Sequence, residues 1–372
     1  MDKIIFVVEP SIYNNDGYKT RVEMEVEILK TYFDCYLLMP SCDREVLFKH
    51  RFKGIFRYDY YEKLPFFFSR NKIQQGLQKV INELGDVLVY CEAIPSAIAT
   101  VSVCKKNHLK LILDCHGDFV SEIRMTRKNP IGKVYAKLIS ILQQEVIEYS
   151  SLIVTVTKEQ YRLFETNKDN VVLPMIPGKS FLVSENFRNE IRQSLNIPQD
   201  SVVFCYAGGN QKWQMAYETL AYYGKIEKKQ ANTFMLVYTR EVRSFEKLAM
   251  DLKIKNIKIL SVNYDEMPRY LDACDYGFCL RQDNMVNRVA SPTKVMEYLS
   301  RNVMPILTEY VGDFSVDLKK QNLAIVLEDL DDVNFEYSRP NIQTRHNIEE
   351  IAKVYRQQYV NAIKHKSLKC FA

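Results

Sequence analysis

The chain has 372 residues, of which 47% are hydrophobic and 26% are charged. These values are typical of a soluble globular protein, and the length suits two α/β domains better than one core. The net charge of +5 is small for this length, which argues against a protein that binds nucleic acid.

The nine cysteines are scattered and form no C-x-x-C pair, so the sequence indicates neither a zinc ribbon nor a redox centre. Several lie inside apolar runs, as free cysteines do in a reducing compartment. The apolar run after Lys3 is too short for a signal peptide, and we find no segment long enough to span a bilayer. We therefore expect a cytoplasmic protein.

Short β-branched runs alternate with longer helical patterns along the chain, which predicts parallel sheets covered by helices on both faces. The first series of expected strands comprises Ile4–Val8, Cys35–Leu38, Val87–Tyr90, Leu111–Asp114 and Leu152–Val156. The second series comprises Val202–Tyr206, Phe234–Tyr238, Ile257–Leu260, Tyr276–Leu280, Met304–Leu307 and Ala324–Leu327. The expected helices include Tyr18–Thr31, Arg124–Tyr149, Ala216–Lys228 and Val295–Arg301.

A linker is expected at Leu173–Gly178, where two prolines and a glycine interrupt regular structure. We therefore predict one doubly wound domain over residues 1–178 and a second over residues 179–345, facing each other across a cleft. A C-terminal helix in residues 346–372 would pack back on the first domain. Ligands of such sheets bind at the carboxyl ends of the strands, so the loops that follow strands are the places to search.

The most informative segment is the helix expected to open at Ser291, with Ser291 as its N-cap and Pro292 at its first position. Thr293 and Glu297 would share one helix face. Lys294 stands where an acidic residue would complete a capping box, and a cation there opposes the helix dipole by about 0.3–1 kcal/mol. We therefore expect a diphosphate on the free amides and Lys294, with Glu297 accepting from a ribose diol. An ordinary capped helix is the alternative.

This region resembles the donor site of GT-B glycosyltransferases, family 4 in particular. The resemblance is carried by Leu271–Gly277, by Arg281 and Asn287, and by Ser-Pro-Thr-Lys-x-x-Glu-Tyr over residues 291–298. It implies a GT-B fold of two Rossmann-like domains. It also implies a nucleotide sugar held by the C-terminal domain, with Arg281 and Asn287 among its contacts, and an acceptor held by the N-terminal domain.

One position departs from the family pattern. Family 4 members commonly carry two glutamates with seven residues between them, and Val289 occupies the place of the first. Asn284 or Asn287 is the candidate substitute as a neutral hydrogen-bonding group.

A second candidate phosphate loop, Tyr206–Gln214, follows an expected strand. Gly208 and Gly209 would let the backbone approach a ligand closely, and Lys212 would reach a phosphate as a point charge. Lys212 also matches a lysine of the family's corresponding loop. The loop lacks the G-x-G-x-x-G pattern, so a nicotinamide cofactor is not supported. A tight turn with a surface lysine is the alternative.

The N-terminal domain contributes candidates on the acceptor side. His116 follows an expected strand and resembles the family histidine that approaches the donor sugar, although a structural histidine is the alternative. Asp114, Glu92 and Glu122 are assigned to the acceptor side; Glu122 would equally cap the following helix. Gly17 is expected in a loop that lets the backbone approach the donor phosphates, or in a plain turn.

Two stretches of the N-terminal half are basic: residues 44–79 carry nine Lys/Arg against three Asp/Glu, and residues 105–137 carry eight against three. Apolar side chains lie among these cations in Leu64–Lys72 and Arg124–Lys137, a mixture that suits the anionic inner surface of a membrane. Peripheral membrane contact is therefore one prediction for these stretches, and core packing of the phenylalanines is the other.

The function predicted is transfer of a sugar from a nucleotide-diphosphate donor to a glycan or glycolipid acceptor, in polysaccharide or glycoconjugate synthesis. Lys212, Lys294 and the helix amides would stabilise the leaving diphosphate, so neither a metal nor a cofactor is expected. The resemblance implies retention of anomeric configuration, with His116, Lys212 and Glu297 as catalytic residues. A sugar-nucleotide epimerase and a non-catalytic partner subunit are the alternatives, and a dehydrogenase is disfavoured.

Overall fold

The structure is a computed structural model that describes residues 1–13, 16–41, 51–60, 67–183, 185–331, 333, 336–341 and 345–368. The chain divides into two compact units. Unit 1 comprises Met1–Pro174 and Val354–Ala372, and unit 2 comprises Met175–Lys353. The division falls within the expected linker. No helix in the described residues combines the length and apolar character needed to cross a bilayer.

Unit 1 is built on a sheet of seven parallel strands in the order β3-β2-β1-β4-β5-β6-β7. Its central strands are buried on both faces, which is why their sequences are continuously apolar. All five expected strands are present, and β3 and β7 were not expected. The strands are β1 (Lys3–Val7), β2 (Asp34–Pro40), β3 (Gly54–Tyr58), β4 (Leu88–Glu92), β5 (Leu111–Cys115), β6 (Leu152–Thr155) and β7 (Asn170–Val172).

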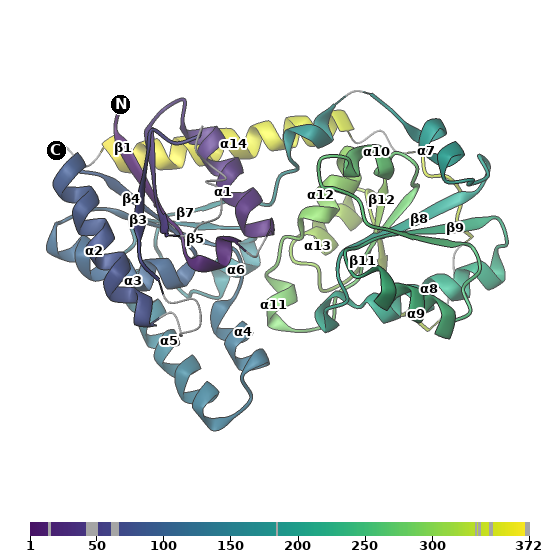
Figure 1. Cartoon of the computed structure of the whole chain (residues 1–372), viewed down its shortest axis with the longest axis horizontal. Coiled ribbons are helices and arrows are strands. Elements are labelled where there is room, and N and C mark those ends of the chain that lie inside the picture. Colours follow the sequence, from purple (N-terminus) through teal and green to yellow (C-terminus); the bar gives the residue numbers. More distant parts are fainter. Residues whose placement is uncertain are drawn as a thin grey trace. The chain divides into compact units, whose positions relative to one another are not determined.

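The helices of unit 1 connect these strands (Figure 1). They are η1 (Pro10–Tyr13), α1 (Asp16–Leu29), α2 (Phe67–Leu84), α3 (Ala93–Lys106), α4 (Phe119–Thr126), α5 (Pro130–Tyr149) and α6 (Lys158–Arg162). The single helix expected over Arg124–Tyr149 is wrong, because the chain turns between α4 and α5. Asn129 caps α5 by accepting a 2.7 Å hydrogen bond from the Gly132 amide, and Pro130 occupies the first turn.

Unit 2 contains six parallel strands in the order β10-β9-β8-β11-β12-β13, and all six were expected. The strands are β8 (Val202–Ala207), β9 (Thr233–Tyr238), β10 (Ile257–Leu260), β11 (Tyr276–Cys279), β12 (Met304–Thr308) and β13 (Ile325–Leu327). The helices are η2 (Lys179–Leu182), α7 (Arg188–Ser194), η3 (Lys212–Gln214), α8 (Ala216–Lys229), α9 (Val242–Asp251), α10 (Met267–Leu271), α11 (Met285–Arg288), α12 (Thr293–Ser300) and α13 (Phe314–Lys320).

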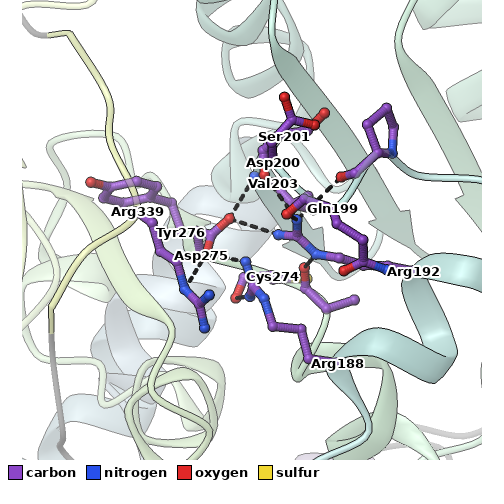
Figure 2. Close-up of polar contacts among 12 residues, drawn as sticks. Arg188, Arg192, Gln199, Asp200, Ser201, Val203, Cys274, Asp275, Tyr276 and Arg339 are labelled. Carbon is purple, nitrogen blue, oxygen red and sulfur yellow. Dashed lines mark hydrogen bonds and ion pairs between the residues drawn. The ribbon is translucent and has the colours of Figure 1, made fainter.

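A buried ionic cluster fixes the amino ends of β8 and β11 (Figure 2). Asp275, immediately before β11, accepts hydrogen bonds from Arg188 at 2.7 Å, from Arg192 at 2.9 Å and from the Val203 amide at 2.8 Å. Arg192 is fully buried. This cluster lies at the opposite ends of the strands from the loops in which ligands of parallel sheets bind. We therefore assign it a structural role.

Helix α14 (Arg345–Leu368) closes the described chain, and its residues are divided between the two units. Ile348 is buried with the apolar residues of α12 and α13 in unit 2. Farther along, Tyr359 belongs to unit 1, where its hydroxyl donates to the Tyr90 hydroxyl at 2.9 Å. The C-terminal helix thus supplies a buried polar group to the core of unit 1.

Candidate functional site

The two predicted phosphate-binding segments of unit 2 meet at the carboxyl end of β8. Gly208 follows this strand with φ +155°, a conformation that side chains rarely adopt. A Cβ atom at Gly208 would lie 2.9 Å from the Lys294 Nζ and 2.5 Å from the Gln214 Oε1. Because both atoms are the ends of flexible side chains, which could move, it is the backbone angle that requires glycine at this position.

The start of α12 differs from the prediction by one residue. The helix begins at Thr293, and Pro292 is its N-cap with φ −63° and ψ 121°. The prediction that Ser291 caps the helix is wrong, because its hydroxyl instead accepts a 3.2 Å hydrogen bond from the Met175 amide. Pro292, as the N-cap residue, makes no side-chain cap hydrogen bond to α12. The Val295 amide donates to the Pro292 carbonyl at 3.1 Å, and the Thr293 and Lys294 amides before it retain the capacity to bind an anion.

Lys294 extends from this helix terminus, and the charge of Glu297 acts on its amine without forming an ion pair in the described residues. Its Nζ lies 4.8 Å from the Tyr206 ring centroid and 3.5 Å from the Gln214 Oε1. Among the described residues, no carboxylate lies within ion-pair distance of this amine. Burial, with the positive charge of Arg281 as the next cause, lowers the pKa of Lys294 to about 8. A bound anion would relieve both effects.

Arg281 is the second cation at this end of unit 2. It follows β11, and its backbone is held by Thr308, whose hydroxyl accepts from the Arg281 amide at 2.9 Å and donates to its carbonyl at 2.8 Å. The guanidinium is mostly buried and, among the described residues, donates only to the Leu280 carbonyl, at 3.5 Å. No ion pair of Arg281 occurs within the described part of the chain. Two partly desolvated cations without carboxylate partners are typical of an anion site.

Glu297 lies one turn farther along α12, and Thr293 is partly buried in the first turn. The Glu297 Oε1 accepts a 2.7 Å hydrogen bond from the Tyr264 hydroxyl. Burial raises the pKa of Glu297 to about 7, although Tyr264 and Lys294 oppose the shift. Tyr264 was not predicted; its position in the loop after β10 was the available signal. The second carboxylate oxygen remains a suitable acceptor for a ribose hydroxyl.

The other residues predicted for this site form no hydrogen bond or ion pair with the Lys294 amine in the described part of the chain. Lys212 is exposed on η3 and forms no ion pair with any described residue. A Cβ at Gly209 would lie 2.5 Å from the Gln211 Oε1. The Asn287 side-chain Nδ2 donates to the Gln282 carbonyl at 2.9 Å and therefore holds the loop before α12. Val289, in the place of the family's first glutamate, is fully buried.

In unit 1 two of the three predicted acceptor-side residues, Glu92 and Asp114, lie in an acidic network that also comprises Arg21, Glu25 and His116. Glu92 ends β4 and Asp114 lies near the end of β5. Arg21 donates to both oxygens of Asp114 at 3.2 Å and lies 2.7 Å from the Glu25 carboxylate. The His116 Nε2 lies 2.7 Å from Asp114 and 3.2 Å from Glu92.

The pKa values of Glu92 and Asp114 in this network shift in opposite directions. Burial and the charge of Asp114 raise the pKa of Glu92 to about 8, so that Glu92 carries a proton at neutral pH. Burial would also raise the pKa of Asp114, but Arg21 and His116 outweigh it and keep that pKa below its usual range. Glu92, Asp114 and His116 offer ligand atoms within 4.8 Å of one another, a spacing that would also suit a metal ion. Because Arg21 already occupies both Asp114 oxygens, we interpret the cluster as an ion-pair network.

Two further predictions are resolved by the helices of unit 1. Gly17 is the second residue of α1, so the prediction that it lies in a loop is wrong. Glu122 lies exposed in the first turn of α4, and the cap of that helix is Asp118, whose carboxylate accepts from the Ser121 amide at 3.2 Å. The alternative role of Glu122 as a cap is therefore excluded. Residues 64–66 of the predicted Leu64–Lys72 membrane-contact stretch lie outside the described residues.

Comparison with known proteins gives a consistent result for the fold. No protein-family model and no curated protein sequence matches the chain. Among solved structures, the trehalose 6-phosphate synthase of Burkholderia multivorans is 10% identical with a TM-score of 0.68, over 99% of this chain and 100% of that protein. Anabaena HepE in complex with UDP is 11% identical with a TM-score of 0.67, over 99% of each chain. The lipopolysaccharide outer core galactosyltransferase WaaB is 12% identical with a TM-score of 0.63, over 98% of this chain and 99% of that protein. The chain therefore has the GT-B fold of two Rossmann-like domains that these glycosyltransferases share.

Proposed function

We propose that the protein is a glycosyltransferase and that unit 2 binds its nucleotide-diphosphate sugar donor. The observation that carries this proposal is the combination at the start of α12. Within the described residues Lys294 and Arg281 form no ion pair, and the N-cap residue Pro292 supplies no side-chain hydrogen bond to the amides that open the helix. Anabaena HepE, which shares the fold, has been crystallised with UDP and with UDP-glucose. A diphosphate supplies the negative charge that this arrangement lacks.

In this proposal the donor's diphosphate lies over the α12 amides, with Lys294 and Arg281 as its counter-ions. Gly208 leaves room for the phosphates beside the Lys294 amine. Glu297, held by Tyr264, accepts from the ribose hydroxyls. As the bond to the sugar breaks, negative charge grows on the diphosphate, and these fixed donors stabilise it more than they stabilise the intact donor. Lys212, exposed on the same loop, adds a charge.

Unit 1 supplies the acceptor side in the same proposal. His116 is held in orientation by Asp114, and protonated Glu92 is a hydrogen-bond donor at neutral pH. Such groups suit the hydroxyls of a glycan or glycolipid, as expected of a hexosyltransferase in polysaccharide synthesis. We propose that no metal takes part, because the cations at α12 are protein side chains. Retention of configuration rests on the family resemblance alone.

The test is release of nucleoside diphosphate from a panel of nucleotide sugars, with and without glycan acceptors. The wild-type chain is expected to process one base and sugar type. Lys294→Met is expected to lose the activity while remaining folded, and Lys247→Met, on the exposed side of α9, serves as the matched control. Conversion of the donor without an acceptor into a new sugar nucleotide would identify an epimerase. Failure to bind any nucleotide would refute the donor site.

A further inference from the structure

Helix α5 has two apolar faces, of which unit 1 covers only one. Its buried face comprises Gly132, Ala136, Ile139, Val146 and Ile147. A second set is exposed to solvent, at 79% for Ile131, 71% for Val134, 45% for Leu138 and 61% for Ile141. Their spacing of three and four residues places them along one side of the helix, which we call the α5 apolar face. Soluble proteins rarely expose such a row without a partner.

Cations surround the α5 apolar face, and the acidic residues next to it in the sequence are Glu122 and Glu145, of which Glu145 pairs with Lys105 at 2.8 Å. Between residues 123 and 144 the sequence contains five basic residues and no Asp or Glu. All five basic side chains are exposed: Arg124, Arg127, Lys128, Lys133 and Lys137. Apolar side chains beside cations are the combination that lies in the interface of an anionic bilayer.

The turn that presents this face is rigidly built. A Cβ at Gly132 would lie 2.2 Å from the Arg127 carbonyl oxygen, so only glycine permits the close turn between α4 and α5. The Arg127 guanidinium packs over the Tyr135 ring at 5.0 Å, and Asn129 caps α5. The turn lies at the end of unit 1 farthest from its sheet (Figure 1). Binding would therefore not have to order this segment first.

We propose that the α5 apolar face docks on an anionic lipid bilayer, with Ile131 and Val134 at the boundary between headgroups and acyl chains. The charge pattern favours lipid over a second copy of the chain, because a symmetric contact would bring five cations against five. The inference goes beyond donor binding and depends on no residue of the donor site. It places the enzyme on a surface where a lipid-linked acceptor would be held.

Vesicle co-sedimentation of the full chain tests the apolar contribution. Vesicles of phosphatidylcholine are compared with vesicles that also contain phosphatidylglycerol, and the wild-type chain is expected to bind the anionic vesicles at least tenfold more tightly. A triple variant of the apolar face should bind them at least tenfold more weakly: Ile131→Gln, Val134→Gln and Ile141→Gln. A matched control replaces three exposed apolar residues elsewhere and should bind as the wild type does: Met250→Gln, Val316→Gln and Val354→Gln.

A charge variant and a depth probe complete the test. Neutralising three lysines beside the face should reduce anionic vesicle binding and its salt dependence, through Lys128→Gln, Lys133→Gln and Lys137→Gln. A matched control neutralises three exposed lysines of unit 2 and should leave anionic vesicle binding unchanged: Lys228→Gln, Lys247→Gln and Lys320→Gln. The indole of Ile131→Trp should be quenched by lipids with brominated acyl chains. The proposal would be overturned if the wild type did not bind vesicles, or if the apolar variant bound them equally well. Dimerisation through this face instead of vesicle binding would also overturn it.

Discussion

Replacement of Lys294 by methionine should stabilise the free protein and abolish its response to nucleotide. The pKa of the buried amine falls from its ordinary 10.5 to about 8. One pH unit corresponds to about 1.4 kcal/mol, so the charged form costs about 3 kcal/mol more in the folded chain than in water. Contact with the Tyr206 ring recovers about 1 kcal/mol of this cost. Methionine keeps the length and apolar contacts of the side chain.

Lys294→Met is therefore expected to raise the free energy of unfolding of unit 2 by about 1–2 kcal/mol, which corresponds to about 2–8 °C in Tm. The wild type, saturated at about 100 times its Kd, should gain about 2.7 kcal/mol from nucleotide, whereas the variant should gain almost nothing. Thermal unfolding with and without a nucleoside diphosphate measures both effects. Lys212→Met is the control, since its exposed amine carries no burial cost and should leave the ligand-free Tm unchanged.

The pH dependence supplies an independent check on the same residue. Because the folded pKa of Lys294 lies below the unfolded one, its cost is fully present below pH 8 and is lost as pH rises towards 10.5. The stability gain of Lys294→Met should therefore shrink between about pH 7 and about pH 10. A variant that is less stable than the wild type, or that keeps its nucleotide response, would refute the reasoning.

Three further predictions concern the surroundings of the site. Tyr264→Phe removes a donor that favours ionised Glu297, so the fall in nucleotide affinity at low pH should move to higher pH, as calorimetry across about pH 6–9 would show; an unchanged profile would mean that Tyr264 does not position the carboxylate. Asp275→Ala leaves the buried Arg192 uncompensated and should cost about 3–5 kcal/mol in a denaturant titration; a change below about 1 kcal/mol would contradict the structural role of the cluster. Donor turnover should survive EDTA, because protein cations replace a metal at the diphosphate; loss of activity, restored by a divalent cation, would direct attention to the acidic network of unit 1.

The sheets could be predicted from the sequence because central parallel strands are buried on both faces and are therefore continuously apolar. β3 and β7 were missed because they are edge strands and lack this continuous apolar pattern. They lie at the two edges of the unit 1 sheet, where β3 includes an exposed Arg57 and β7 has only three residues. The break between α4 and α5 was indicated by Asn129 and Pro130, but the strong helical pattern on both sides obscured it.

Candidate residues for the site could be chosen from the sequence where a local pattern singles them out. Lys294 could be chosen because a cation at that position opposes the helix dipole, Glu297 because it lies one turn deeper, and both because they match the family signature. Long-range contacts could not be inferred in this way: the Ser291 hydroxyl bonds an amide 116 residues away, and the partner of Glu297 is Tyr264, 33 residues away. A serine before a helix has two competing uses for its oxygen, and only the fold decides between them.

The central claim is that Lys294 and the start of α12 hold a diphosphate, and proton uptake on binding tests it most directly. Near pH 8 the free amine is about half protonated, and a bound diphosphate raises its pKa. Calorimetric titration with a nucleoside diphosphate, in two buffers of different ionisation enthalpy, should show net proton uptake in the wild type and weak or absent binding in Lys294→Met. Tight binding without proton uptake, or equal binding by the variant, would contradict the claim.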